Sequence, residues 1–206
     1  MLLAIDTSTG TSVAVVDHGA GVIAEAGTPD TMRHAEVVGD LIRQALAAAS
    51  ITPSRLSGVA GGMGPGPFTG LRVGIAAAHA FALGIRRPFV PVVSHDAVAW
   101  LWYHEGGDGP MQVVTDARRR EFAVSAYDGL DDAGLPIRAV GPQLVPRDEV
   151  PERDGARVDA STVSAGGIGM VAELAFAAGR LPLTGDAPLY LRAPDVTPSA
   201  GKRVLR

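Results

Sequence analysis

Cysteine is absent from this 206-residue chain, and its absence excludes several chemistries at once. A chain without cysteine has no disulfide, no thiolate nucleophile and no cysteine-ligated zinc, and its redox compartment stays undetermined. Charged residues are also sparse, at 19%, and the net charge of −4 gives no general positive excess for binding phosphate groups. If the chain works on RNA, we therefore expect a partner protein to hold that RNA.

The chain also lacks a recognisable targeting signal. Its first ten residues, MLLAIDTSTG, have no basic start and reach Asp6 before an apolar run builds up, which argues against a signal peptide. No stretch of about 18 apolar residues stands out as a membrane span. We expect a cytoplasmic protein that does not enter a membrane.

Hydrophobic residues make up 47% of the sequence, a globular composition that allows one compact unit or two small lobes. Apolar runs separated by turn-forming residues predict strands, and apolar residues at helical spacing predict helices. In the first half, the predicted strands are Leu2–Ile5, Ser12–Val16, Gly21–Ala26, Leu56–Ala60 and Phe89–Val93. The predicted helices are an amphipathic one from Thr31 to Ala49, one from Thr69 to Gly84, and a third with Ser94 as its N-cap.

Four turn-forming residues between His104 and Pro110 predict a boundary between lobes 1–103 and 104–206. The second half contains fewer predicted helices and strands than the first. It shows strands at Gln112–Thr115 and Glu121–Tyr127, then Pro-rich irregular sequence, a helix at about Gly167–Ala178 and the short run Pro188–Arg192. This partial repeat of the first half predicts an α/β fold of two lobes with a common plan.

Five glycines and two prolines crowd the segment from Gly61 to Gly70, between a predicted strand and a predicted helix. Glycines and a helix N-terminus can cradle a phosphate. The segment has no Lys-Ser/Thr ending and no G-x-G-x-x-G spacing, so it matches neither common phosphate loop. A rigid corner between strand and helix is the preferred interpretation, and a phosphate cradle is the alternative.

The run from Gly64 to Arg72, GPGPFTGLR, resembles the GPGSFTGLR signature of the TsaB (YeaZ) family, with Pro67 in place of serine. The resemblance extends over nearly the whole chain. It includes LLAIDTST at the start, His34-x-Glu36, Asp116-Ala117-Arg118-Arg119 with Glu121, and Pro188–Arg192. It implies a two-lobe actin-like (ASKHA, ribonuclease H-like) fold with a reduced second lobe. The signature loop then consists of Gly64, Pro65, Gly66, Phe68, Thr69 and Gly70.

The same resemblance implies a function without catalysis in this chain. Proteins of this family are held to be scaffolds or activators of the complex that transfers threonylcarbamoyl to N6 of the tRNA adenosine next to the anticodon. The implied partners are a TsaD-like catalytic subunit, a TsaE-like ATPase subunit in the assembled complex, and a second copy of the chain when it is alone. Contact with tRNA is expected only through the complex, and no cofactor is expected.

An enzyme remains the alternative, as a stand-alone actin-like ATPase or small-molecule kinase. Actin-like ATPases carry an Asp-x-Gly turn in each lobe, but this chain has Asp6-Thr7-Ser8 and Asp116-Ala117-Arg118, with side chains where glycines are needed. The small residues of Ser164–Gly169 keep a nucleotide pocket open as a weaker possibility. No two histidines are spaced four apart, and His34 and Glu36 diverge on a helix, so we expect neither metal ligands nor catalytic residues.

The helix after the signature loop is apolar nearly all round, which predicts that it is covered on more than one side. In the family, the first two helices are held to form a bundle with TsaD. We therefore predict a partner interface that Ile75→Arg would break without unfolding the chain. Its predicted residues are His34, Val37, Val38, Leu41, Arg72, Ile75 and His79.

The only basic triplet is Arg118–Arg120. Placed on an alternating strand, Arg118 and Arg120 share one face and are predicted to reach an RNA phosphate. A solvated strand edge that discourages pairing with another chain is the preferred alternative.

Overall fold

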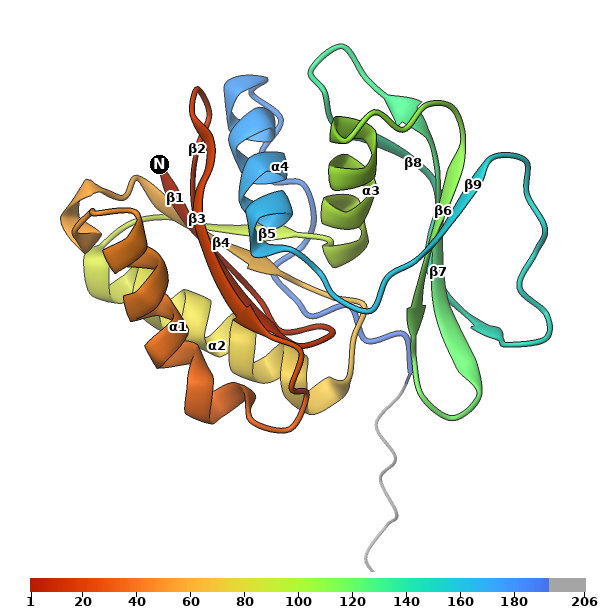
Figure 1. Cartoon of the computed structure of the whole chain (residues 1–206), viewed down its shortest axis with the longest axis horizontal. Coiled ribbons are helices and arrows are strands. Elements are labelled where there is room, and N and C mark those ends of the chain that lie inside the picture. Colours follow the sequence, from red (N-terminus) through yellow and green to blue (C-terminus); the bar gives the residue numbers. More distant parts are fainter. Residues whose placement is uncertain (193–206) are drawn as a thin grey trace, which may run out of the picture.

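The computed structural model describes residues 1–192, which form two β-sheets with helices outside and between them (Figure 1). The first sheet has the order β3-β2-β1-β4-β5. Its strands are β1 (Leu2–Asp6), β2 (Thr11–Asp17), β3 (Gly21–Thr28), β4 (Gly58–Gly62) and β5 (Phe89–Val92). All of β1 is buried, because helices cover both faces of the sheet, and this explains its unbroken apolar run.

Helices α1 (His34–Ala48) and α2 (Phe68–Ile85) cover one face of this sheet, and α4 (Ala165–Ala177) covers the other. The glycines at the start of α4 let it approach its neighbours closely. A Cβ on Gly166 would lie 2.8 Å from Val22, and one on Gly169 would lie 2.6 Å from Val16. The small residues that kept a nucleotide pocket open are thus explained by helix packing on the sheet.

The second sheet has the order β8-β7-β6-β9 and repeats the pairing pattern of β3-β2-β1-β4. Its strands are β6 (Met111–Asp116), β7 (Glu121–Leu130), β8 (Pro136–Pro146) and β9 (Ala156–Asp159). Residues 147–155, all within the described part of the chain, contain no helix, and the sheet has no counterpart of β5. The predicted fold, two actin-like α/β lobes with a reduced second lobe, is confirmed.

Helix α3 (Ser94–His104) packs between α4 and the second sheet, so one hydrophobic core runs through both lobes. Because α4 lies on the first sheet, the two lobes are interleaved along the sequence. The lobe boundary between residues 103 and 104 stays a prediction.

Three local predictions were wrong. The segment predicted as irregular contains β8 and β9. Strand β8 lies at the edge of its sheet, where a proline on the unpaired side removes no hydrogen bond to a neighbouring strand. The short strand before the signature loop begins at Gly58 rather than Leu56, after a 3₁₀ turn at Pro53–Arg55. Ser94 is the first residue of α3 rather than its N-cap, and its hydroxyl bonds elsewhere.

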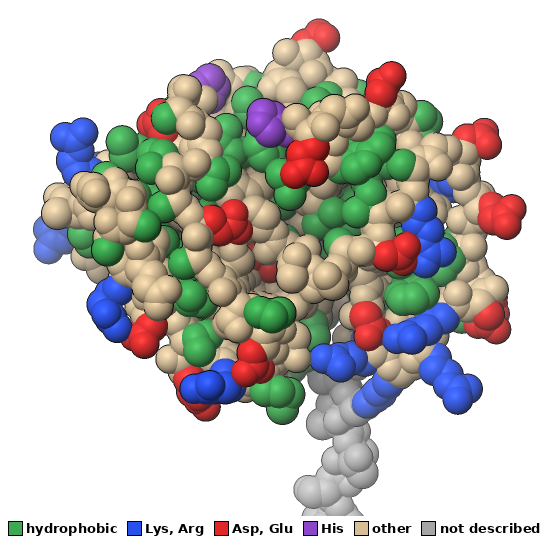
Figure 2. Space-filling view, viewed as in Figure 1, with side chains coloured by type: hydrophobic (Ala, Val, Ile, Leu, Met, Phe, Trp, Pro, Cys, Tyr) green, Lys and Arg blue, Asp and Glu red, His purple; other side chains and the backbone are tan. Residues whose placement is uncertain are grey.

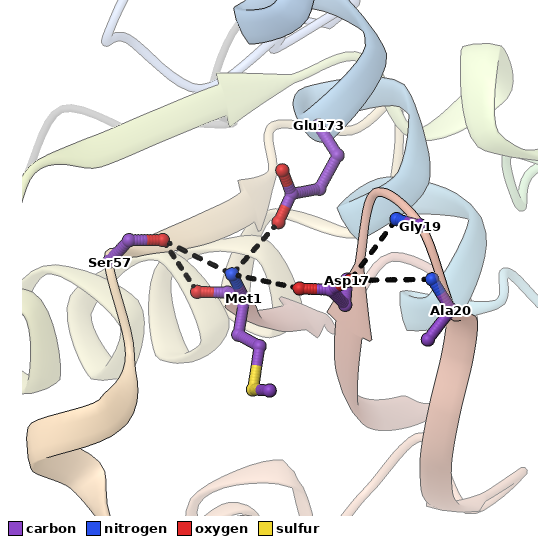
Figure 3. Close-up of polar contacts among 6 residues, drawn as sticks. All are labelled: Met1, Asp17, Gly19, Ala20, Ser57 and Glu173. Atoms are coloured by element: carbon purple, nitrogen blue, oxygen red, sulfur yellow. Dashed lines mark hydrogen bonds and ion pairs between the residues drawn. The ribbon is translucent and has the colours of Figure 1, made fainter.

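The Met1 amine joins three elements at the start of β1 (Figure 3). It lies 3.6 Å from Asp17 Oδ2, 3.3 Å from Glu173 Oε1 and 3.4 Å from Ser57 Oγ. The Glu173 side chain is almost entirely buried. These contacts connect β1 with the end of β2 and with α4.

Helix α2 is long and apolar enough, by length and composition, to cross a membrane. Its 18 residues have a mean hydropathy of 1.4, contrary to the expectation that no such stretch exists. A helix that packs on a sheet passes the same test, and α2 contacts β4, β1 and α1.

Candidate functional site

The signature loop lies directly on the turn that follows β1. A Cβ on Gly66 would lie 2.8 Å from the Ser8 backbone, one on Gly70 would lie 2.8 Å from the Thr7 carbonyl oxygen, and one on Gly74 would lie 2.1 Å from Thr7 Oγ1. These positions admit no side chain without displacing the turn. Two glycines of the motif and Gly74 just after it therefore allow the close contact between two backbone segments.

Hydrogen bonds fix this contact. Thr7 Oγ1 donates to the Gly70 carbonyl at 2.8 Å, and Ser94 Oγ donates to Asp6 Oδ2 at 2.6 Å while accepting from the Gly64 N–H at 3.1 Å. Burial raises the pKa of Asp6, against the hydrogen bonds from Ser8 and Ser94 that act to lower it. Both oxygens of this carboxylate are engaged by neighbouring hydroxyl and amide groups, so it has a structural role in this conformation.

A cavity of about 430 Å³ lies between the lobes, bordered by the turn after β1 on one side and the turn after β6 on the other. The two degenerate Asp-x-Gly turns that the sequence picked out thus meet at one place. The cavity is lined by Ser8, Pro65, Gly66, Pro67, Phe68, Thr115, Asp116, Ala117, Arg118, Arg119, Ala123, Leu144, Tyr190, Leu191 and Arg192.

The segment near the end of the described chain crosses from one lobe to the other beside this cavity. The Leu189 N–H donates to the Met63 carbonyl at 2.8 Å, and the Tyr190 ring lies 4.6 Å from that of Phe68. Arg72 Nε donates to Tyr190 Oη at 2.9 Å, and Arg192 forms an ion pair with Glu121 of the second lobe. The short run that sequence reasoning marked only as a family feature therefore holds the signature loop in place.

The arginine triplet is not on a strand. Arg118, Arg119 and Arg120 form the turn between β6 and β7, with φ of 64°, 53° and 61°. The prediction that Arg118 and Arg120 alternate on a strand face was therefore wrong, and so was the edge-strand interpretation, because β7 lies between β6 and β8. Left-handed φ is read poorly from sequence at residues other than glycine and asparagine.

The predicted interface residues divide between core and surface. His34, Val38, Leu41 and Ile75 are only 6–9% exposed, and the His34 ring bonds Thr11 Oγ1 at 2.8 Å. These four side chains are not available for direct contact with a partner. Val37 is half-buried, Arg72 lies 3.6 Å above the Phe68 ring, and His79 pairs with Asp186 at 3.0 Å.

A buried polar cluster that sequence reasoning missed joins α3 to the second sheet. His95 is fully buried between Ser125 Oγ at 2.8 Å and Thr115 Oγ1 at 2.9 Å. Its neighbour Asp96 accepts from Tyr127 Oη at 2.8 Å and from Arg138 at 3.3 Å. Burial, assisted by the Arg138 charge, lowers the pKa of His95 to about 3, so the ring is neutral at ordinary pH.

Within residues 1–192, no group of three His, Asp or Glu side chains is placed to hold a metal ion. The turns that border the cavity carry side chains in place of glycines, and Pro67 has no N–H to donate to a phosphate. What the site does have is a rigid corner from which α2 starts.

Two lobes of one sheet plan, with a cavity between them bordered by a turn from each, define an actin-like protein. A family model described as "TsaD: tRNA N6-adenosine threonylcarbamoyltransferase" matches residues 20–146, more than half of the chain. The chain belongs to this family.

Individual relatives agree with the family. An uncharacterized protein of Mycobacterium tuberculosis is 38% identical over 213 residues, covering 97% of this chain and 95% of the relative. The tRNA threonylcarbamoyladenosine biosynthesis protein TsaB of Escherichia coli is 29% identical over 135 residues, covering 65% and 57%. A solved structure from Pseudomonas aeruginosa, described as similar to peptidase YEAZ, superposes with a TM-score of 0.79 at 26% identity, covering 93% and 99%. The predicted resemblance to TsaB (YeaZ) is confirmed.

Proposed function

We propose that this chain is a non-catalytic subunit in tRNA threonylcarbamoyladenosine biosynthesis, which pairs with a TsaD-like catalytic protein through α1 and α2. The relatives' names support the pathway. In the complete assembly a TsaE-like ATPase joins the pair, tRNA is engaged by the complex, and the isolated chain self-associates through the same helices in the cytoplasm.

The observation that carries the proposal is the incomplete burial of α2. Only 33% of the residues in this apolar helix are buried within the chain. Its outer stripe consists of Thr69, Arg72, Ala76, Ala80 and Leu83, spaced three or four apart, and Leu83 is 80% exposed. Small side chains let another helix backbone approach closely, so this stripe fits a helix of a partner better than it fits water.

The test uses the exposed stripe rather than Ile75. Ile75 packs with Met63 and Leu71, so Ile75→Arg would bury an unpaired charge and unfold the corner. We expect the double variant Ala76→Arg/Ala80→Arg to fold normally, because both positions are exposed and helical, but to lose co-purification with the TsaD-like protein of the same organism.

The matched control is Ala177→Arg, an exposed position at the end of α4 on the opposite face of the sheet. It should pair as the wild type does. Equal recovery of the partner with Ala76→Arg/Ala80→Arg would refute the helix interface.

The second candidate function is that of an actin-like ATPase or small-molecule kinase. The observation in its favour is that the cavity lies between the two lobes, next to the turns after β1 and β6. This function requires nucleotide binding by the isolated chain, whereas the scaffold does not.

A further inference from the structure

The β6–β7 turn presents its three arginines from a defined backbone. The Arg118 N–H donates to Asp116 Oδ1 at 2.9 Å, the Glu121 N–H donates to the Arg118 carbonyl at 3.0 Å, and the Arg147 N–H donates to the Arg120 carbonyl at 3.0 Å. Three consecutive left-handed arginines are unfavourable for the backbone. The hydrogen bonds hold the turn in this conformation, and all three side chains are exposed.

Arginines from three other segments surround this turn. Arg147 pairs with Asp116 at 2.8 Å, the Arg157 guanidinium lies 5.7 Å from the Phe122 ring, and Arg192 pairs with Glu121. Figure 2 shows Lys and Arg side chains gathered at the lower right, where Figure 1 places the β6–β7 turn. We call the group the arginine tip; it comprises Arg118, Arg119, Arg120, Arg147, Arg157 and Arg192.

The tip is locally positive on a chain whose net charge is −4. Within residues 1–192, Asp116, Asp159 and Glu121 form ion pairs with Arg147, Arg157 and Arg192, and Arg118 and Arg120 add two further guanidinium groups. A positive patch on an otherwise acidic protein attracts a polyanion to one place on the surface. Each guanidinium can also bind phosphate oxygens through two parallel hydrogen bonds.

The tip lies between the partner helices and the cavity. Arg118 Nη2 donates to Thr31 Oγ1 at 3.4 Å, which places the tip beside the segment that leads into α1. Arg118, Arg119 and Arg192 also line the cavity. A partner seated on α1 and α2 would therefore have these arginines at the edge of its interface.

We propose that the arginine tip binds the phosphate backbone of the tRNA on which the partner acts. The inference rests on the proposed function, because the partner brings that tRNA to this edge of the chain. Phosphates of one RNA strand are repeated along its length, and the tip likewise spreads its charges over four chain segments. A single nucleotide in the cavity would leave Arg120, Arg147 and Arg157 unused, since these three do not line it.

The experiment measures binding of an unmodified tRNA transcript to the complex with the TsaD-like protein, by filter retention at low and moderate salt. The test variant is Arg118→Asn/Arg120→Asn, because asparagine tolerates left-handed φ. We expect roughly tenfold weaker binding at low salt and a salt dependence shallower by about two phosphate contacts. The charge-conserving variant Arg118→Lys/Arg120→Lys should keep most of the affinity and the full salt dependence.

The control is Arg55→Asn/Arg87→Asn, which removes the same charge from exposed positions just before β4 and β5, at the sheet end opposite the cavity. This control should bind tRNA as the wild type does. Wild-type affinity and salt dependence in the tip variant, with pairing intact, would overturn the inference. Loss of nucleotide binding with unchanged tRNA binding would also overturn it, in favour of a nucleotide site.

Failure of the wild type to pair with its partner would refute the proposed function separately. The same salt titration on the isolated chain then decides the inference. Salt-dependent binding that the tip variant weakens supports it, and equal binding by wild type and variant contradicts it.

Discussion

Gly74, two residues after the signature motif, shows at the level of one residue how α2 packs against the turn after β1. A Cβ there would lie 2.1 Å from Thr7 Oγ1, whose hydroxyl is already bonded to Gly70. We expect Gly74→Ala to lower the free energy of unfolding by about 1–3 kcal/mol, the usual cost of overpacking. Urea denaturation measures this change.

Gly84 in the same helix is the matched control. A Cβ on it would meet nothing within 4 Å, so Gly84→Ala should raise the free energy of unfolding by roughly 0.5–1 kcal/mol, as alanine does in an exposed helix. If both substitutions stabilise the protein, the close contact between α2 and the turn after β1 is not what selects glycine at position 74.

His95 makes a second residue-scale prediction, on pH. Its pKa is about 3 in the folded chain against an ordinary value of 6.5, so between these values the unfolded chain binds more protons. Stability therefore falls as pH drops from 6.5 toward 3, by up to about 1.4 kcal/mol per pH unit from this group. His95→Gln should show a correspondingly shallower loss when unfolding is measured from pH 7 to pH 4.

Asp6 and Asp96 change the stability with pH in the opposite direction, and both the wild type and His95→Gln retain these two carboxyl groups. Burial raises the pKa of each carboxyl, so their contribution to stability is present below the ordinary value of 3.8 and is lost as pH rises through the folded value. The difference between the pH dependence of wild type and that of His95→Gln therefore excludes the contribution of these two carboxyl groups. Parallel pH profiles for wild type and His95→Gln would contradict the assignment to His95.

At the level of elements, periodicity and apolar runs in the sequence predicted most of the helices and strands. Within residues 1–192, the five strands of the first sheet and the four α-helices were found within a few residues, because apolar runs or apolar residues at helical spacing mark each of them. Strands β8 and β9 were missed because an edge strand accepts proline and β9 has only four residues. The turn after β6 was missed because side-chain alternation continues on paper through Arg118–Arg120, whereas the backbone there is left-handed.

The site was predicted less well than the helices and strands, because many of its contacts join residues that are distant in the sequence. The motif located the corner and both degenerate turns, since these are local in sequence. Contacts such as Tyr190 with Arg72 and Ser94 with Asp6 join residues far apart along the chain. The inward direction of Ile75 could not be read either, because α2 is apolar on nearly every side and its pattern does not mark the face that packs on the sheet.

For the whole molecule, the decisive question is whether a ligand bridges the lobes. The lobes share one core through α3 and α4, and the segment around Tyr190 and Arg192 connects them again beside the cavity. These contacts join the two lobes within the chain itself. An actin-like ATPase differs, because its nucleotide contacts both lobes and stabilises the closed form.

Thermal unfolding with Mg²⁺ and ATP separates these cases. A nucleotide at 100 times its Kd would raise the free energy of unfolding by about 2.7 kcal/mol. For a chain of this length, that corresponds to a Tm increase of roughly 5–10 °C. We expect no measurable increase with ATP, because Ser8 and Arg118 stand where the Asp-x-Gly turns of actin-like ATPases have glycine, whereas adding the TsaD-like partner should raise the Tm. An ATP-dependent increase of several degrees in the isolated chain would favour the enzyme over the scaffold.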